Sequence, residues 1–180
     1  MIIGLCGFAQ SGKSTTAEHL EKKYGFQRVN MKDGLISEMK QNFPELLKEL
    51  CVTYNMTIDE LFKEKPPAMR ALMQNYGTNV RRNDDPNHWV DIWTNKVSEM
   101  KGNIVVDDIR FFNELSALTE KDGVLIRVKR PDIVSAGSHK SETEQRLFIE
   151  DFTIEGVAGS HTEIYEQADE IINVIKRNYD

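Results

Sequence analysis

The amino-acid sequence predicts an α/β fold, with a mainly parallel central sheet of about five strands between two layers of helices. Two observations predict it. Short apolar runs alternate with longer stretches of helical periodicity, and a glycine-rich turn joins the first run to the first helix. Strands that alternate with helices pair in parallel, because right-handed crossovers return the chain to the same sheet. At 180 residues the chain can build one substantial core, so we expect a single domain over residues 1–180.

The first half of the chain predicts a strand, a turn, a helix and a second strand. An apolar run predicts a buried strand over residues 2–6, and helical spacing of apolar side chains predicts a helix over 13–24. A second strand is expected over 26–30. Two or three helical pieces follow between about 33 and 65, where residues 57–60 have the form of a capping box.

The second half continues the alternation, and its last strand is expected either over 151–155 or over 171–174. The other elements are, in chain order, a helix over 67–81, a helix after Pro86, a strand over 103–107, a helix around 112–118, a strand over 124–128 and a largely helical tail from 163 onward. In such sheets, ligands bind at the carboxyl ends of the strands.

Composition and charge exclude several classes of protein. The net charge of -6 argues against a nucleic acid polymer as partner, because phosphate neutralisation needs a basic surface. Cys6 and Cys51 are only two and lack metal-ligand spacing, which argues against a zinc site and against a disulfide framework. Neither a signal-peptide pattern nor a long apolar run is visible, so we expect a cytoplasmic protein with no membrane partner.

Residues 7–14, GFAQSGKS, fit the pattern GxxxxGK[ST] of a phosphate-binding loop between a strand and a helix. Glycines let successive backbone N–H groups turn inward onto phosphate oxygens. Lys13 is expected to reach the β and γ phosphates, and Ser14 to bind Mg²⁺. The alternative is a glycine-rich turn with a chance Lys-Ser pair. The candidate residues for a nucleoside triphosphate are Ala9, Gln10, Ser11, Gly12, Lys13, Ser14 and Thr15.

Two carboxylates, Asp107 and Asp108, follow the strand expected over 103–107. A magnesium-bound phosphate site usually needs a carboxylate at the end of a second strand, so either aspartate is a candidate for the metal. The alternative is a solvated strand end or a helix cap. The sequence leaves open which aspartate serves the metal.

A second candidate site lies on the helix expected over 67–81. Arg70, Gln74, Thr78 and Arg81 recur at steps of four, four and three, which places them on one α-helical face. Guanidinium groups suit phosphate oxygens, and an amide can read a base edge. Gly77 lowers helix stability and indicates the close approach of something bulky. An ordinary solvated helix face is the competing interpretation.

Further cations and acids follow the strand over 124–128. Arg127, Lys129 and Arg130 could stabilise a phosphoryl group in transit, or they could be surface charges at a strand end. Ser141 and Glu144 form a capping-box pattern. His139 and Glu142 are less easily explained by capping, and both could face the cleft at which the substrates bind.

Taken together, these motifs resemble the phage-type deoxynucleoside monophosphate kinases of the P-loop nucleoside monophosphate kinase superfamily. The segments that carry the resemblance run in family order from Ile2 to about Leu147 and are GFAQSGKST, RALMQNYGTNVR, PNHWV, VVDDIRFFNE, VKRP and HKSETE. The resemblance implies one P-loop NTPase domain, with a helical lid and substrate region, that transfers the γ phosphate of ATP to a deoxynucleoside monophosphate with Mg²⁺. It also implies the host cytoplasm if a phage encodes the chain.

The resemblance carries roles onto particular residues. Lys13, Asp108, Arg110 and Arg130 are the expected catalytic positions. The expected monophosphate side consists of Asp33, Arg70, Gln74, Gly77, Thr78, Arg81, Trp89 and Glu142. Asp107 departs from the pattern by adding a second acid, and residues 40–66 match no family feature, so base selectivity is not predicted. Whether the chain forms a homodimer is also left open.

Two other functions remain open from the sequence. Another small-molecule P-loop kinase, acting on a sugar, a shikimate-like acid or phosphomevalonate, would share the ATP half and differ in the acceptor face. A nucleotide-controlled switch would need a guanine-reading motif. Residues 94–98, TNKVS, resemble NKxD only faintly, because Ser98 replaces the aspartate.

Overall fold

The computed structural model describes residues 1–132, 143–157 and 160–179. By its internal contacts the chain divides into two compact units. Unit 1 combines residues 1–30 with residues 96–180, and unit 2 consists of residues 31–95. The single domain expected over the whole chain stays a prediction. Among the described helices, none has the length and apolar character needed to cross a bilayer.

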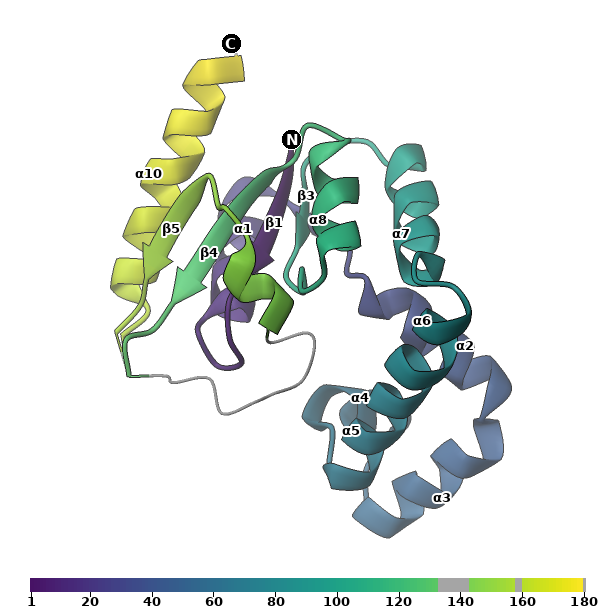
Figure 1. Cartoon of the computed structure of the whole chain (residues 1–180). Coiled ribbons are helices and arrows are strands. Elements are labelled where there is room, and N and C mark those ends of the chain that lie inside the picture. Colours follow the sequence, from purple (N-terminus) through teal and green to yellow (C-terminus); the bar gives the residue numbers. More distant parts are fainter. Residues whose placement is uncertain (133–142, 158–159, 180) are drawn as a thin grey trace. The chain divides into compact units, whose positions relative to one another are not determined.

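Unit 1 is built on a five-stranded sheet in which every pairing is parallel, in the order β2-β3-β1-β4-β5 (Figure 1). The strands are β1 (Ile2–Cys6), β2 (Gln27–Arg28), β3 (Ile104–Val106), β4 (Val124–Lys129) and β5 (Phe152–Glu155). This confirms the predicted α/β class. The last strand is the candidate over 151–155, whereas residues 171–174 lie in the final helix.

Helices cover both faces of this sheet, which gives the three predicted layers. The connection from β1 to β2 contains α1 (Lys13–Tyr24), and the connection from β3 to β4 contains α8 (Phe112–Thr119) and runs in the opposite direction. Because crossovers are right-handed, opposite directions place the two helices on opposite faces. Ile3 and Leu5 accordingly join the core with α1, while the position of a Cβ on Gly4 lies 2.4 Å from Leu118 of α8.

The C-terminal helix α10 (Thr162–Tyr179) lies beside β5 and packs against α1 (Figure 1). Asp169 of α10 holds the two helices together. Its carboxylate lies 2.8 Å from His19 Nε2 and accepts hydrogen bonds from Lys23 Nζ at 2.6 Å and from Tyr24 OH at 2.7 Å. Burial raises the pKa of Asp169, but these three partners outweigh it and lower the pKa to about 2.

We predict that Asp169→Asn lowers the free energy of unfolding by about 1 to 3 kcal/mol at pH 7, because charged hydrogen bonds are lost. The folded-state pKa is depressed, so the contribution is present above the unfolded value of about 3.9 and is lost as the pH falls towards 2. Urea unfolding of the parent and of Asp169→Asn, at pH 7 and between pH 4 and 2, measures this difference in the free energy of unfolding. Asp59→Asn, which removes an exposed carboxylate paired with Lys40, is the control and should change stability by less than about 0.5 kcal/mol. Equal effects of the two substitutions would contradict the prediction.

Unit 2 is helical and has its own core. Its helices are α2 (Lys32–Asn42), α3 (Pro44–Tyr54), α4 (Ile58–Glu64), α5 (Pro67–Gln74), the π-helix η1 (Asn75–Arg81), α6 (Arg82–Asp84) and α7 (His88–Glu99), the last turn of which belongs to unit 1. Met39, Leu47, Leu61 and Met69 are fully buried in this core. The capping box predicted at residues 57–60 is confirmed, because Thr57 accepts a hydrogen bond from the Glu60 backbone.

The helix predicted over 67–81 changes from α to π geometry after Gln74. A π-helix pairs residues i and i+5, so each turn holds an extra residue and the later side chains rotate away from their α-helical positions. Arg81 stands five residues after Tyr76, and its Nε donates to the Tyr76 hydroxyl at 3.0 Å. The α-helical spacing that placed Arg81 on the same face as Arg70 is therefore wrong.

Candidate active site

The loop that follows β1 has the backbone of an anion-binding turn. Gly7 and Gly12 adopt φ values of +136° and +109°, and Gln10 adopts +65°. A Cβ on Gly7 would lie 2.2 Å from the Val128 carbonyl oxygen, so only glycine fits there. The strand order reverses at β1, which lies between β3 and β4. This is the topological switch point at which such sheets bind ligands.

Positive charge is concentrated at the mouth of this loop. The Lys13 ammonium donates to the carbonyl oxygens of Gly7 and Phe8, both at 2.7 Å, and so lies over the loop. Lys13 is also the first residue of α1, where unpaired backbone N–H groups and the helix dipole favour an anion. The loop therefore supplies the local positive site that an acidic protein needs to hold a phosphate.

Ser11 supports the same conclusion. Its hydroxyl is buried and has no hydrogen-bond partner among the described residues. A buried hydroxyl without a partner costs roughly 1 to 3 kcal/mol, and a phosphate oxygen could accept a hydrogen bond from it. Ala9 and Gln10 are exposed at the tip of the loop, and Thr15 is half-buried in the first turn of α1.

The structure brings Asp107, and not Asp108, to the hydroxyl of the phosphate-binding loop. Ser14 Oγ donates to Asp107 Oδ2 at 3.1 Å. Asp107 follows β3 directly, and its backbone N–H donates to Asn30 Oδ1 at 2.8 Å, which fixes the turn. Arg28 Nη1 lies 3.4 Å from the same Asp107 oxygen. Asp108 is also buried, one residue further along the chain.

The donors around Ser14 fit a magnesium ion that is held mainly by phosphate and water. Mg²⁺ prefers oxygen ligands and is usually bound through one or two protein groups together with substrate phosphates. Ser14 and Asp107 supply an oxygen pair of this kind. Within residues 1–132, 143–157 and 160–179, no cluster of three or more His, Cys, Asp or Glu side chains could hold a metal without such help.

The turn after Asp108 is fixed by a residue that the sequence analysis missed. Glu114 in the first turn of α8 is buried, and its Oε2 accepts hydrogen bonds from the backbone N–H groups of Arg110 and Phe111 at 2.7 and 3.1 Å. The Arg110 side chain is exposed. An acid in the first turn of the expected helix was the only signal, and it pointed to an ordinary cap.

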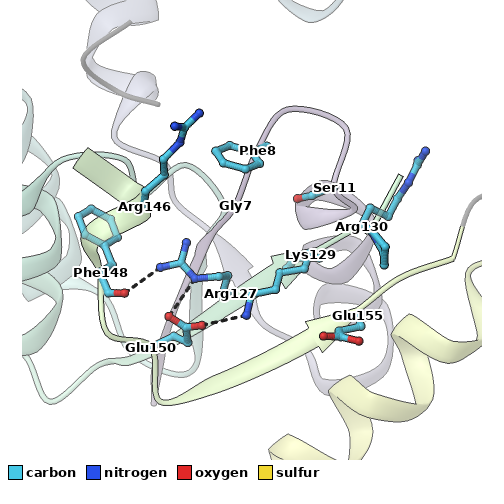
Figure 2. Close-up of a pocket in the computed structure, with 12 residues that line it drawn as sticks. Gly7, Phe8, Ser11, Arg127, Lys129, Arg130, Arg146, Phe148, Glu150 and Glu155 are labelled. Carbon is cyan, nitrogen blue, oxygen red and sulfur yellow. Dashed lines mark hydrogen bonds and ion pairs between the residues drawn. The ribbon is translucent and has the colours of Figure 1, made fainter. Parts of the chain in front are cut away.

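A cavity of about 530 Å³ opens between the phosphate-binding loop and β4 (Figure 2). Four cations contribute to its lining, with two acids. These six residues are Arg127, Lys129, Arg130, Arg146, Glu150 and Glu155. The excess of positive charge suits a phosphorylated ligand.

The cations of this cavity differ in what they contact. Arg130 pairs with Asp132 through two hydrogen bonds, at 3.0 and 2.6 Å, and reaches the Gln10 carbonyl at 3.3 Å. Lys129 lies 3.3 Å from Glu150. Arg127 has a side chain that is 11% exposed and pairs with Glu150 at 2.9 Å. It also donates to the backbone carbonyls of Gln145 and Phe148, so it anchors the segment that precedes β5.

Unit 2 contains a polar cluster around Glu38. The Tyr76 hydroxyl donates to Glu38 Oε2 at 2.8 Å, Arg81 Nη2 lies 2.9 Å from the same oxygen, and His88 Nε2 lies 2.5 Å from Oε1. Burial raises the pKa of Glu38, but the hydrogen bonds from Tyr76 and His88 and the charge of Arg81 outweigh it and lower the pKa. Glu38 and His88 were not predicted, because their partners are distant in sequence.

The other residues predicted for the second substrate are spread over unit 2. Arg70 and Gln74 are exposed on α5, while Thr78 and Asp33 are half-buried. Gly77 packs closely against Leu35, since a Cβ would lie 3.1 Å from its Cδ2 atom.

Trp89 is buried, and its indole N–H donates to the Gly77 carbonyl at 3.0 Å. The bulky neighbour inferred for Gly77 is therefore part of the core of unit 2. Glu142 and His139 lie outside the described residues.

Known structures share this fold. A protein of Thermus thermophilus, TT1252, is 18% identical, with a TM-score of 0.51 over 97% of this chain and 96% of that one. The dephospho-CoA kinase of Campylobacter jejuni is 16% identical, with a TM-score of 0.50 over 99% and 98%. The parallel sheet and the phosphate-binding loop together define the P-loop NTPase fold, which is the predicted fold class.

Within that class, the chain belongs to the deoxynucleotide monophosphate kinase family, whose model matches residues 37–155. The match begins after the phosphate-binding loop, so the loop and the family assignment are separate observations. A protein of Acanthamoeba polyphaga mimivirus, named as a candidate deoxynucleotide monophosphate kinase, is 28% identical over 171 residues, covering 81% of this chain and 82% of its own length. The predicted family and the predicted phosphotransferase class are confirmed.

Proposed function

We propose that this kinase transfers the γ-phosphoryl group of ATP to the phosphate of a deoxynucleoside monophosphate, giving ADP and the deoxynucleoside diphosphate. The observation that carries the donor half is the arrangement at the end of β1. Lys13 lies over the loop, and Ser14 contacts Asp107. The family assignment carries the acceptor half.

The donor residues have distinct tasks in this proposal. The loop amides and the Ser11 hydroxyl hold the triphosphate, and the Lys13 ammonium neutralises charge on its terminal phosphates. Ser14 and Asp107 would hold the Mg²⁺ that accompanies ATP, which supplies further neutralisation of the phosphate oxygens. Arg130 and Arg110 remain candidates for stabilising the charge of the phosphoryl group during its transfer.

The acceptor requires little acid–base chemistry. A monophosphate is largely ionised at pH 7, so in-line attack needs positioning and charge neutralisation and no strong general base. The candidate acceptor residues are Asp33, Arg70, Gln74, Thr78, Arg81 and Glu142. Gly77 and Trp89 shape the π-helix η1, which carries Thr78 and Arg81. We propose that both sets of residues belong to one kinase domain over residues 1–180.

An acceptor panel tests this proposal. ADP release would be measured with ATP and Mg²⁺ against all common ribo- and deoxyribonucleoside monophosphates, with shikimate and phosphomevalonate as foreign acceptors. We expect turnover with at least one deoxynucleoside monophosphate and none with the foreign acceptors. Turnover restricted to a foreign acceptor would overturn the acceptor assignment. The panel would be repeated with GTP in place of ATP, and turnover found only with GTP would overturn the choice of ATP.

We predict that Arg81→Ala raises the KM for the monophosphate about ten- to hundredfold, with a smaller change in the KM for ATP. The reason is the loss of a charged hydrogen-bond donor, which is worth about 1.5 to 3 kcal/mol. Steady-state kinetics with each substrate varied in turn measures both constants. Lys48→Ala, which removes an exposed cation of α3 that pairs with Glu45, is the control and should leave both constants within about threefold. An unchanged KM for every monophosphate in Arg81→Ala would remove this residue from the acceptor site.

A further inference from the structure

Gln145 is a buried amide in an otherwise exposed segment. It begins the short 3₁₀-helix η2 (Gln145–Leu147) and is 1% exposed, whereas Arg146 is exposed and Leu147 is 71% exposed. Burying a polar side chain is unfavourable unless it is hydrogen-bonded. Gln145 Oε1 accepts the backbone N–H of Gly7 at 3.1 Å, across 138 residues of sequence. The first residue of the phosphate-binding loop is thus held by a side chain from the far end of the chain.

Gly7 is the point at which the chain leaves the sheet. The last pair between β1 and β4 is Cys6 with Arg127, so the Gly7 amide lies just beyond the ladder. Its N–H donates to the side-chain oxygen of Gln145. Gly7 is also confined on its other side, because its Cα lies against the Val128 carbonyl and leaves no room for a Cβ. Together these contacts set where the loop begins and how it turns.

Gln145 is itself fixed to the sheet. Arg127 Nη1 donates to the Gln145 carbonyl at 2.9 Å. Its Nη2 donates to the Phe148 carbonyl, also at 2.9 Å, and its Nε pairs with Glu150 (Figure 2). A guanidinium group has five donors in a rigid plane, so these three contacts leave the segment from Gln145 to Glu150 little freedom. The Gly7 N–H therefore donates to a residue whose backbone is held in place by Arg127.

The next residue, Arg146, lies at the same cavity. Its guanidinium carbon is 5.4 Å from the centre of the Phe8 ring, and Figure 2 shows the two side chains next to each other. Phe8 follows Gly7 in the loop. The loop and η2 therefore contact each other at two consecutive residues on each side, through a hydrogen bond and a cation–π contact.

We propose that Gln145 is a positioning residue for the phosphate-binding loop. By accepting the Gly7 amide it preorganises the loop for the triphosphate and keeps Arg146 beside that loop. A bond that is already formed before the nucleotide arrives removes part of the ordering cost of binding. The proposal rests on the proposed function in one respect, which is that ATP is the ligand of the loop.

Two substitutions separate positioning from packing. Gln145→Met keeps the size of the side chain and removes the acceptor, whereas Gln145→Glu keeps an acceptor oxygen for the Gly7 N–H. Amide hydrogen exchange over residues 7–14 and the Kd for ATP would be measured for both. We expect Gln145→Met to exchange the Gly7 amide at least about tenfold faster and to bind ATP about tenfold more weakly. Gln145→Glu should stay within about threefold of the parent in both.

Gln27→Met is the matched control, because it removes an amide that donates to the Lys101 carbonyl away from the loop. It should leave both measurements unchanged. Equal behaviour of the Met and Glu variants at Gln145, with a folded protein, would overturn the proposal, because packing alone would then explain the residue. If Gln145→Met does not fold, Gln145→Asn takes its place, because its side-chain oxygen is one methylene further from the Gly7 N–H. It is compared with Gln145→Glu in the same way. Amide exchange and ATP binding do not depend on which molecule receives the phosphoryl group. Failure of the panel of phosphoryl acceptors would therefore leave this result intact.

Discussion

Lys13→Ala is expected to lower turnover by roughly a thousandfold while leaving the fold intact. Removing one preorganised charge from a reaction that proceeds by charge neutralisation costs about this much. The ammonium lies on the loop, with the Gly7 and Phe8 carbonyls as its acceptors, and it is not part of the core. Its loss should therefore affect phosphate binding far more than the free energy of unfolding.

Steady-state kinetics at saturating ATP and monophosphate measures the effect, and thermal unfolding checks the fold. Lys22→Ala is the matched control, because Lys22 lies on the same helix α1 with a side chain that is 74% exposed. It should keep turnover within about twofold. Near-normal turnover in Lys13→Ala would remove the loop from the reaction, and a large drop in thermal stability would show that the lysine is structural.

The sheet could be predicted from the sequence because its signals are local. Strands buried on both faces appear as short apolar runs, and β1, β3 and β4 were found in this way. The second strand was predicted over five residues, but only Gln27 and Arg28 pair with β3. Strand ends depend on the neighbouring strand, which a single segment of sequence does not contain.

The π-helix η1 could not be predicted, because it depends on distant partners. Its sequence has ordinary helical spacing, and the extra residue per turn is offset by contacts to Glu38 and Trp89. Tyr76 and Arg81 both reach Glu38, which lies 38 and 43 residues earlier in the chain. No pattern within residues 67–81 contains that information.

The phosphate-binding loop was predictable for the opposite reason, since its residues are contiguous. The groups that support it were not predictable, because they come from elsewhere in the chain: Gln145 contacts Gly7, and Asn30 contacts the Asp107 backbone. Adjacent residues after a strand diverge in direction, so the sequence named two aspartates and could not choose between them. The contact of Asp107 with Ser14 at 3.1 Å is the structural reason for which we favour Asp107 as the candidate.

Asp107→Asn is expected to weaken the apparent affinity for Mg²⁺ about ten- to hundredfold, and Asp108→Asn much less. Outer groups that orient a metal ligand typically contribute this much, and Asp107 Oδ2 accepts the hydrogen bond of Ser14. Asparagine keeps the shape and removes the charge, while the Asp107 backbone stays bound to Asn30. The substitution thus acts on the metal site and spares the turn.

Two measurements distinguish the aspartates. Turnover would be titrated with Mg²⁺ at fixed ATP, and binding of Mn²⁺ in the presence of ATP would be followed by electron paramagnetic resonance, which does not require the reaction to proceed. Asp107→Asn should need about ten- to hundredfold more metal in both, because the neutral amide orients Ser14 less strongly and places no negative charge beside the proposed metal site. If Asp108→Asn has the larger effect, Asp108, the aspartate that the family resemblance named, serves the metal. The contact between Ser14 and Asp107 is then structural.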